Sequence, residues 1–202
     1  RVDSIVAQGC RPIGQPMFVT SCDNNVLITL DGKSAIPALK ALYDSCDDGD
    51  KALFKQSLFL GLVMDAERQT YGPGDFLIRN ISGMDPKRAG LVTGAVLRTN
   101  QVVQFHLRDA AASAHDLDVH LTAYARAEPE APSGALMFSC LGRGELLYGR
   151  PNHDSDRIAH LVGETPVGGF FCNGEFGRVG DRTWLHGYTS AIGLFRPLQR
   201  AC

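Results

Sequence analysis

Three short turns in the sequence combine glycine with side chains that can bind a small polar ligand. The turns are Gly9-Cys10-Arg11-Pro12, Ser139-Cys140-Leu141-Gly142-Arg143-Gly144 and Cys172-Asn173-Gly174-Glu175. Each carries a cysteine, two carry an arginine, and the third carries a carboxylate. Each also comes at the end of a predicted strand, where sheets packed with helices usually place their ligands. Because arginine binds a carboxylate through paired hydrogen bonds, converging turns would suit a small zwitterion or carboxylate.

The third turn lies in a segment, Val167–Phe195, that is dense in glycine and holds the only tryptophan. Glycine at this density between apolar runs indicates tight turns and close backbone approach. The turns and this segment together provide eight candidate ligand-binding residues: Arg11, Ser139, Arg143, Cys172, Asn173, Glu175, His186 and Tyr188. Structural roles stay open for them, such as a packed thiol, a solvated carboxylate or a structural histidine.

A catalytic alternative uses three of the same residues. Cys172 as nucleophile, His186 as base and Glu175 as the group that orients the base would form an acyl-transfer triad. The residue types are present, but the sequence says nothing of their geometry. We therefore favour binding over catalysis and assign no catalytic residue.

Metal ligands are present in the sequence, but their spacing is unfavourable. His115 and His120 stand five residues apart on a predicted helix. Five residues turn a helix by roughly 500°, so these two side chains point well apart. His153, Asp154 and Asp156 are interpreted as residues that begin a helix. The patterns of a phosphate-binding loop, a dinucleotide-binding loop and a nucleophile elbow are all missing, so we predict neither metal nor cofactor.

Composition narrows the class of protein. The formal net charge is −2 and no basic stripe is visible, which argues against a nucleic-acid partner. The longest apolar run, Leu58–Met64, is too short to cross a bilayer. Six scattered cysteines, at positions 10, 22, 46, 140, 172 and 202, are typical of reduced, buried thiols. These features predict a cytoplasmic or otherwise intracellular protein, an organelle included.

The first half of the chain is predicted to be mostly strands. Residues 1–32 resemble edge or linker strands of a preceding domain, with the turn-rich run Gly9–Gly14 between two of them. The abrupt start on an apolar run suggests the carboxyl-terminal part of something longer. Two helices are expected over residues 35–46, begun by Ser34, and 51–56. Four strands then form an antiparallel meander, at residues 58–64, 76–80, 91–97 and 102–107.

The second half alternates helices and strands. Asp109 is expected to cap a helix that runs to about Ala127. A strand is expected at 135–140, followed by a helix from Asp154 or Ser155 to Val162. Two more strands are expected at 167–172 and 189–195. Between them we expect a loop at 173–183 and a short segment at 184–188. The fold class is α+β, with a mixed, largely antiparallel sheet and three or four packing helices.

Several motifs resemble one known family. Gly168–Gly177 (GGFFCNGEFG), Val179-Gly180 and Leu185–Thr189 (LHGYT) closely resemble the end of FIST domains. Two upstream motifs, Phe138–Gly144 and Pro151–Asp154, also resemble this family, and Ser4–Gly14 resembles the junction after its amino-terminal half. The resemblance divides the chain into the end of an amino-terminal half at 1–32 and a carboxyl-terminal FIST domain at 33–202.

The resemblance implies a sensory domain of signalling proteins that binds a small molecule, such as an amino acid, and acts on a partner protein. Phe176 and Arg178 depart from it, because the family places an aliphatic residue and proline there. A bulky ring and a charge could instead face a partner, so a structural or assembly subunit is the alternative function. A cysteine-dependent hydrolase is the third.

Overall fold

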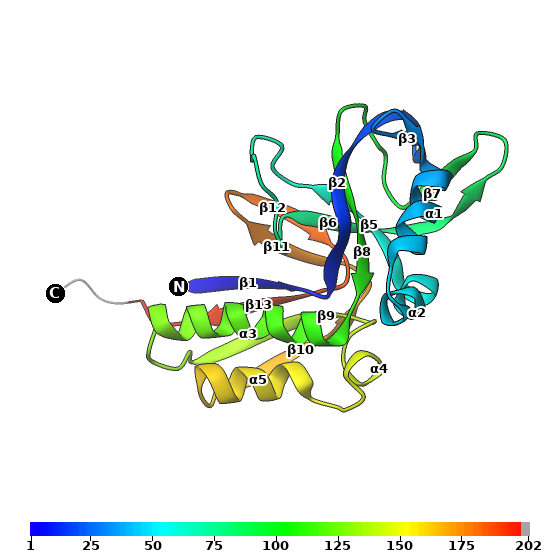
Figure 1. Cartoon of the computed structure of the whole chain (residues 1–202). Helices are drawn as coiled ribbons and strands as arrows, with labels where there is room; N and C mark the ends of the chain where they lie inside the picture. The colour runs from blue at the N-terminus through cyan, green and yellow to red at the C-terminus, as the bar shows by residue number, and fades with distance from the viewer. Residues whose placement is uncertain (199–202) are drawn as a thin grey trace. The chain divides into compact units, whose positions relative to one another are not determined.

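The chain divides into two structural units, and residues 1–198 of it are described by the computed structural model. Unit 1 comprises Arg1–Gly9 and the chain from Asp109 onward, and unit 2 comprises Cys10–Arg108. The α+β class is confirmed, with mainly antiparallel sheets and helices packed on them (Figure 1). Cys202 lies outside the described residues.

The main sheet of unit 1 has four strands: β1 (Val2–Gln8), β13 (Thr189–Phe195), β9 (Gly134–Cys140) and β10 (Val167–Cys172), in this order. Strand β13 runs antiparallel to both of its neighbours, β1 and β9, whereas β9 and β10 run parallel. Parallel neighbours need a crossover connection. Here α4 (Glu145–Tyr148) and α5 (His153–Val162) lie within that connection, so both strands end beside the start of α5.

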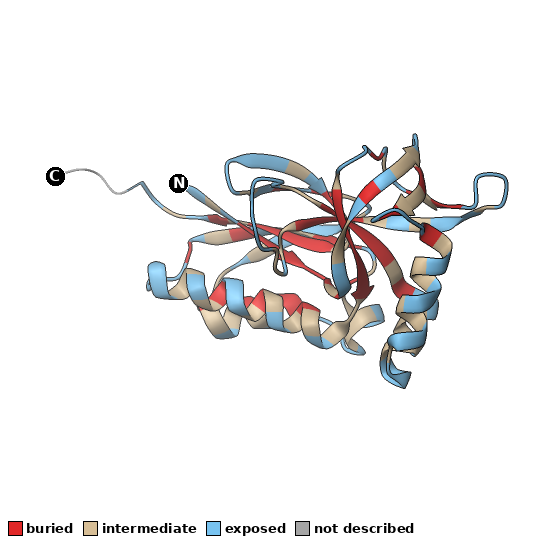
Figure 2. Cartoon of the chain, turned by 45° about the horizontal axis from the view of Figure 1, so that its top comes forward, coloured by how far each residue is buried: buried red, intermediate tan, exposed pale blue. Residues whose placement is uncertain are grey.

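Two helices bury one face of this sheet. The helices α3 (Ala110–Ala127) and α5 lie side by side against it (Figure 1). As predicted, the Asp109 side chain caps α3, accepting a hydrogen bond from the Ala112 amide. The sides of the helices that face the sheet are buried (Figure 2). The resulting core contains Ile5, Ala7, Leu117, Leu121, Ala135, Ile158, Val162, Ile192 and Leu194.

A hairpin replaces the loop predicted at residues 173–183, and that prediction was wrong. The strands β11 (Glu175–Val179) and β12 (Arg182–His186) pair antiparallel across a two-residue turn. Gly180 has φ 59°, a left-handed conformation that suits the first position of such a turn. Short segments rich in glycine carry little periodic signal, so the strand pairing was hidden in the sequence.

Unit 2 is a seven-stranded antiparallel sheet with two helices. The strands are, in order, β2 (Cys10–Asp23), β8 (Val102–Arg108), β5 (Leu58–Val63), β6 (Phe76–Asp85), β7 (Gly90–Thr93), β3 (Val26–Leu30) and β4 (Lys33–Ser34). Because β2 also pairs with β3, the sheet closes on itself. The helices α1 (Ala35–Ser45) and α2 (Asp48–Ser57) contact strands β3 and β8 respectively.

The turn predicted at Gly9–Gly14 was also wrong. Strand β2 begins at Cys10 and pairs with β8 from there onward. Its register shifts between Ile13 and Met17, where Gly14 has φ 68°. A bulge thus accommodates the glycine and keeps the strand continuous. Strand β1 precedes it in the sheet of unit 1, so the first 32 residues contribute strands to both units.

Smaller differences concern the ends of elements. Strand β6 runs five residues beyond the predicted end, whereas β7 stops at Thr93, whose side chain donates to the carbonyls of Asn25 and Ala95. The four-residue helix α4 was not predicted. Ser34 stands at the start of α1 without a side-chain capping bond. The described cysteines form no disulfide with one another; Cys10 and Cys140 are buried, and Cys22, Cys46 and Cys172 are partly buried.

Candidate functional site

A cavity of about 270 Å³ in unit 1 lies where β9 and β10 end and α5 begins. Ser139 and Phe171 line it from the strands, and the first turn of α5 lines it from the helix. The remaining lining residues are Met137, Gly144, Glu145, Pro151, Asn152, His153, Asp154 and Ser155. A second hollow of about 260 Å³ shares Met137, Ser139, Ser155 and Phe171 with it and continues along β10.

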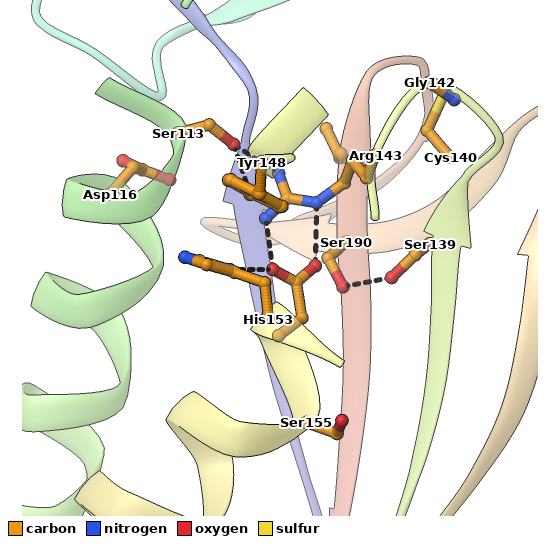
Figure 3. Close-up of polar contacts among 12 residues, drawn as sticks. Ser113, Asp116, Ser139, Cys140, Gly142, Arg143, Tyr148, His153, Ser155 and Ser190 are labelled. Atoms are coloured by element: carbon orange, nitrogen blue, oxygen red, sulfur yellow. Dashed lines mark hydrogen bonds and ion pairs between the residues drawn. The ribbon is translucent and has the colours of Figure 1, made fainter. Parts of the chain in front are cut away.

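Beside the cavity, Arg143 and Asp154 form a buried ion pair. Arg143 Nε lies 2.9 Å from Asp154 Oδ2 and Nη2 lies 3.2 Å from Oδ1, so the contact is bidentate. Arg143 is 2% exposed, and its Nη1 donates to Ser113 Oγ at 2.8 Å (Figure 3). Burial by itself would raise the pKa of Asp154, but the guanidinium outweighs it and the pKa lies below its usual value.

Two stacked rings complete this cluster. The rings of Tyr148 and His153 have centroids 3.6 Å apart and lie nearly parallel. Tyr148 Oη shares a 2.8 Å hydrogen bond with Ser113 Oγ, and His153 Nδ1 lies 2.9 Å from Asp154 Oδ1. Burial raises the pKa of Tyr148 to about 12. The cluster therefore holds the turn after β9 against the start of α5 (Figure 3).

A second polar cluster surrounds Glu175, which is 1% exposed. Glu175 Oε2 accepts hydrogen bonds from Thr189 Oγ1 at 2.8 Å and from the Thr189 amide at 3.3 Å. Its other oxygen, Oε1, lies 3.5 Å from the Cys172 thiol. Burial raises the pKa of both Glu175 and Cys172, so the Cys172 thiol stays protonated at neutral pH.

The other candidate residues occupy different surroundings. His186 is buried in β12, with Nε2 3.1 Å from the Gly177 carbonyl. Tyr188 has φ 64°, and Asn173 is exposed between β10 and β11. Arg11 belongs to unit 2, where it forms an ion pair with Asp50. The seven remaining candidates belong to unit 1.

Of the proposed triad, the structure joins Cys172 to Glu175, and Glu175 also accepts hydrogen bonds from Thr189. A cysteine that acts as a fast catalytic nucleophile at neutral pH needs a lowered thiol pKa, whereas burial raises the pKa of Cys172. These contacts support a structural or binding role for the three residues.

Asp154 has a second role that the sequence does not indicate. As predicted, it lies in the first turn of a helix, and its carboxylate is also the buried partner of Arg143. Tyr148 and Ser113 were not singled out, and Ser155 was named only as a possible start of the helix. The one available signal was the Pro151–Asp154 motif following Arg143, which marks two neighbouring turns without showing that they meet.

The part of the chain that the structure describes holds no group of three or more potential metal ligands. His120 lies 3.8 Å from Asp116, its neighbour one helical turn earlier. Within residues 1–198, no helix is long and apolar enough to span a membrane.

Comparison with known proteins identifies the family. The FIST C domain matches residues 35–178, and the FIST N domain matches residues 1–33. An uncharacterized protein of Mycobacterium tuberculosis is 38% identical over 192 residues, covering 95% of this chain and 50% of the relative. An uncharacterized protein of Mycobacterium bovis is 36% identical over 191 residues, with the same coverage. An F-box/LRR-repeat protein of Arabidopsis thaliana is 29% identical over 150 residues, covering 65% of this chain and 27% of the relative.

The chain thus spans half the length of the mycobacterial relatives that it matches. FIST domains are in general sensory domains for small ligands in signal transduction. The motifs of the last strands, the α+β fold and the match over residues 35–178 agree, and the chain belongs to the FIST domain family.

Proposed function

We propose that the chain is a sensory module that binds an amino acid, or a small carboxylate of similar size, in the cavity between β9, β10 and α5. The observation that carries this proposal is a hollow of about 270 Å³ with a helix start and a carboxylate on its wall. Its volume is at the small end of ligand pockets, which favours a ligand with few heavy atoms.

The start of α5 supplies the anion-binding side. Asn152 precedes the helix, and its side chain makes no capping hydrogen bond. Amide groups in the first turn of a helix have no partner inside the helix, and the helix dipole favours negative charge there. A ligand carboxylate near Ser155 would accept hydrogen bonds from these amides.

The opposite charge on the wall comes from Glu145, an exposed carboxylate in the first turn of α4. It could accept hydrogen bonds from a ligand ammonium group. Met137 and Phe171 supply apolar surface for the remainder of the ligand. In this arrangement Arg143 does not bind the ligand directly, because its contacts to Asp154 and Ser113 hold the wall in place.

Calorimetric titration with amino acids and with matched carboxylates that lack the amine tests this proposal. We expect Glu145→Gln to weaken amino-acid binding by about tenfold, roughly 1.4 kcal/mol, and to leave binding of the amine-free carboxylates unchanged. Glu130→Gln, in the exposed loop before β9, is the matched control and should bind like the natural chain. Failure of every amino acid and small carboxylate to bind the full chain would refute the proposal.

A second function, that of an assembly subunit, is favoured by one observation on the hairpin. Phe176 and Leu185 are register partners on β11 and β12, and they are 74% and 51% exposed. An exposed apolar pair of this kind suits a protein partner. Native mass spectrometry of the complex isolated from its own cells should then show loss of the partner with Phe176→Ala, whereas Val2→Ala, at another exposed apolar residue, should retain it. A natural chain that is monomeric in its own lysate would exclude this function.

A further inference from the structure

Two free cysteines face each other at the ends of the parallel strands. Cys140 is the last residue of β9, Cys172 is the last residue of β10, and the two are register partners. Register partners on neighbouring strands point to the same face of a sheet. Strands lie about 4.8 Å apart, which falls inside the range of roughly 4.4–6.8 Å between the Cα atoms of disulfide-bonded cysteines.

Hydrogen bonds near the two sulfur atoms also hold the ends of β9 and β10 together. The Cys172 thiol lies 3.6 Å from the Ser139 carbonyl, which belongs to the peptide bond just before Cys140. The backbone is tied at the same level, because the Leu141 amide donates to the Cys172 carbonyl at 2.9 Å. The Cys140 sulfur accepts from the Gly142 amide at 3.5 Å. Joining the sulfurs therefore needs side-chain rotation and little movement of the strands.

We propose that Cys140 and Cys172 are a redox modification site, at which hydrogen peroxide converts the thiol pair into a reversible disulfide. The thiolate of Cys172, the more exposed of the two, attacks one peroxide oxygen and forms a sulfenic acid with release of water. The thiolate of Cys140 then attacks that sulfur, the S–S bond forms, and the sulfenic oxygen leaves as a second water. Two thiols are oxidised, one peroxide is reduced, and both thiol protons end in water.

The surroundings determine the rate and the consequence of this reaction. Because burial raises the pKa of Cys172, the thiolate is scarce at neutral pH and oxidation is slow. Glu175 Oε1 lies 3.5 Å from the thiol and loses that donor when the disulfide forms. Ser139 and Phe171, which line the cavity, immediately precede the two cysteines. The disulfide would therefore fix the spacing of the two strand ends at the cavity wall.

Peptide mass mapping of the natural chain, treated with hydrogen peroxide and then alkylated without reduction, tests the proposal. We expect one cross-linked species, containing the Cys140 and Cys172 peptides and two hydrogen atoms lighter than their sum. Dithiothreitol should return both peptides to their reduced masses. Below the thiol pKa, the initial rate should rise by about tenfold for each pH unit, because the thiolate is the reacting form.

Two variants make the test specific, and neither outcome depends on ligand binding. Cys46→Ser changes a partly buried cysteine of unit 2 and should leave the cross-link unchanged. Cys140→Ser should abolish it and leave Cys172 as a sulfenic or sulfinic acid. Oxidation of Cys172 to sulfinic acid in the natural chain without a cross-link, or a cross-link from Cys172 to any other cysteine, would overturn the proposal.

Discussion

At the scale of single residues, the ion pair between Arg143 and Asp154 is the charged contact whose loss should change the free energy of unfolding most. Both side chains are nearly inaccessible to solvent, and the contact is bidentate. A buried pair is not necessarily more stable than an apolar substitute, but removing one partner leaves the other charge buried without compensation. The cost of breaking the pair is therefore much larger than its net contribution to stability.

We expect Asp154→Asn to lower the free energy of unfolding by about 3–5 kcal/mol, because Arg143 stays charged and buried. Urea denaturation followed by circular dichroism measures this loss. Since the pKa of Asp154 is lowered in the folded state, its stabilisation is present above the usual carboxyl pKa and is lost as the pH falls through the lowered value. The Asn variant should lack this acid dependence.

Asp156→Asn is the matched control for that substitution. Asp156, in the first turn of α5, forms an ion pair with Arg150, which precedes the helix, but both side chains are about half exposed. Exposed pairs contribute roughly 0–1 kcal/mol, so this variant should unfold almost like the natural chain. Equal losses in the two variants would contradict the assignment of Asp154 as a buried partner.

At the scale of elements, the β11–β12 hairpin depends on one close backbone approach. Gly177 lies so near β1 that an added Cβ would stand 2.2 Å from Val6 Cγ2. Two carbon atoms that are not bonded to each other cannot lie that close, so any side chain there must displace the hairpin or Val6. Glu175 lies on the same strand and makes hydrogen bonds to Thr189. The glycine therefore positions the Glu175 cluster as well.

We predict that Gly177→Ala destabilises the chain by about 1–3 kcal/mol through overpacking. Adding Val6→Ala removes the clashing methyl group and should recover part of that loss in the double variant. Gly168→Ala is the control, because its Cβ would meet only an ordinary contact at 3.6 Å. Thermal unfolding of the natural chain, Gly177→Ala, Val6→Ala and the double variant gives the coupling energy, and strict additivity of the two substitutions would show that no clash exists.

At the scale of the whole molecule, the units found by structure and the division predicted from motifs fall at different places. The chain leaves unit 1 after Gly9 and returns to it after Arg108, whereas the motifs suggest a division near residue 33. The latter stays a prediction, and the family matches at residues 1–33 and 35–178 describe sequence similarity alone. Strand pairing accounts for the structural boundary after Gly9, because β1 pairs with β13 in unit 1 and β2 pairs with β8 in unit 2.

We expect a fragment beginning at residue 34 not to fold. Its sheets would lack β1, β2 and β3, and the core around Leu117 would lose Ile5 and Ala7. Circular dichroism and the dispersion of amide proton signals should show an unfolded chain, with the intact 202-residue chain as the control. Cooperative unfolding of this fragment would instead support an independent domain from residue 33 onward.

The sequence by itself determined the family, the α+β class and the elements with clear periodicity. The helix capped by Asp109 and the strands that end at Cys140 and Cys172 were recognisable because local hydrogen bonding and apolar spacing specify them. It also located the turns at residues 139–144 and 172–175, where glycine and polar residues alternate.

Only the tertiary structure decided which of these turns meet and what their side chains contact. Long-range pairing joined Arg143 to Asp154 and Glu175 to Thr189, and it put Arg11 with Asp50 in the other unit. The hairpin at residues 175–186 and the bulged strand at Cys10–Asp23 also depend on pairing partners distant in sequence. Local propensity cannot specify such contacts, because their energy comes from burial and hydrogen bonds made only when the sheets have assembled.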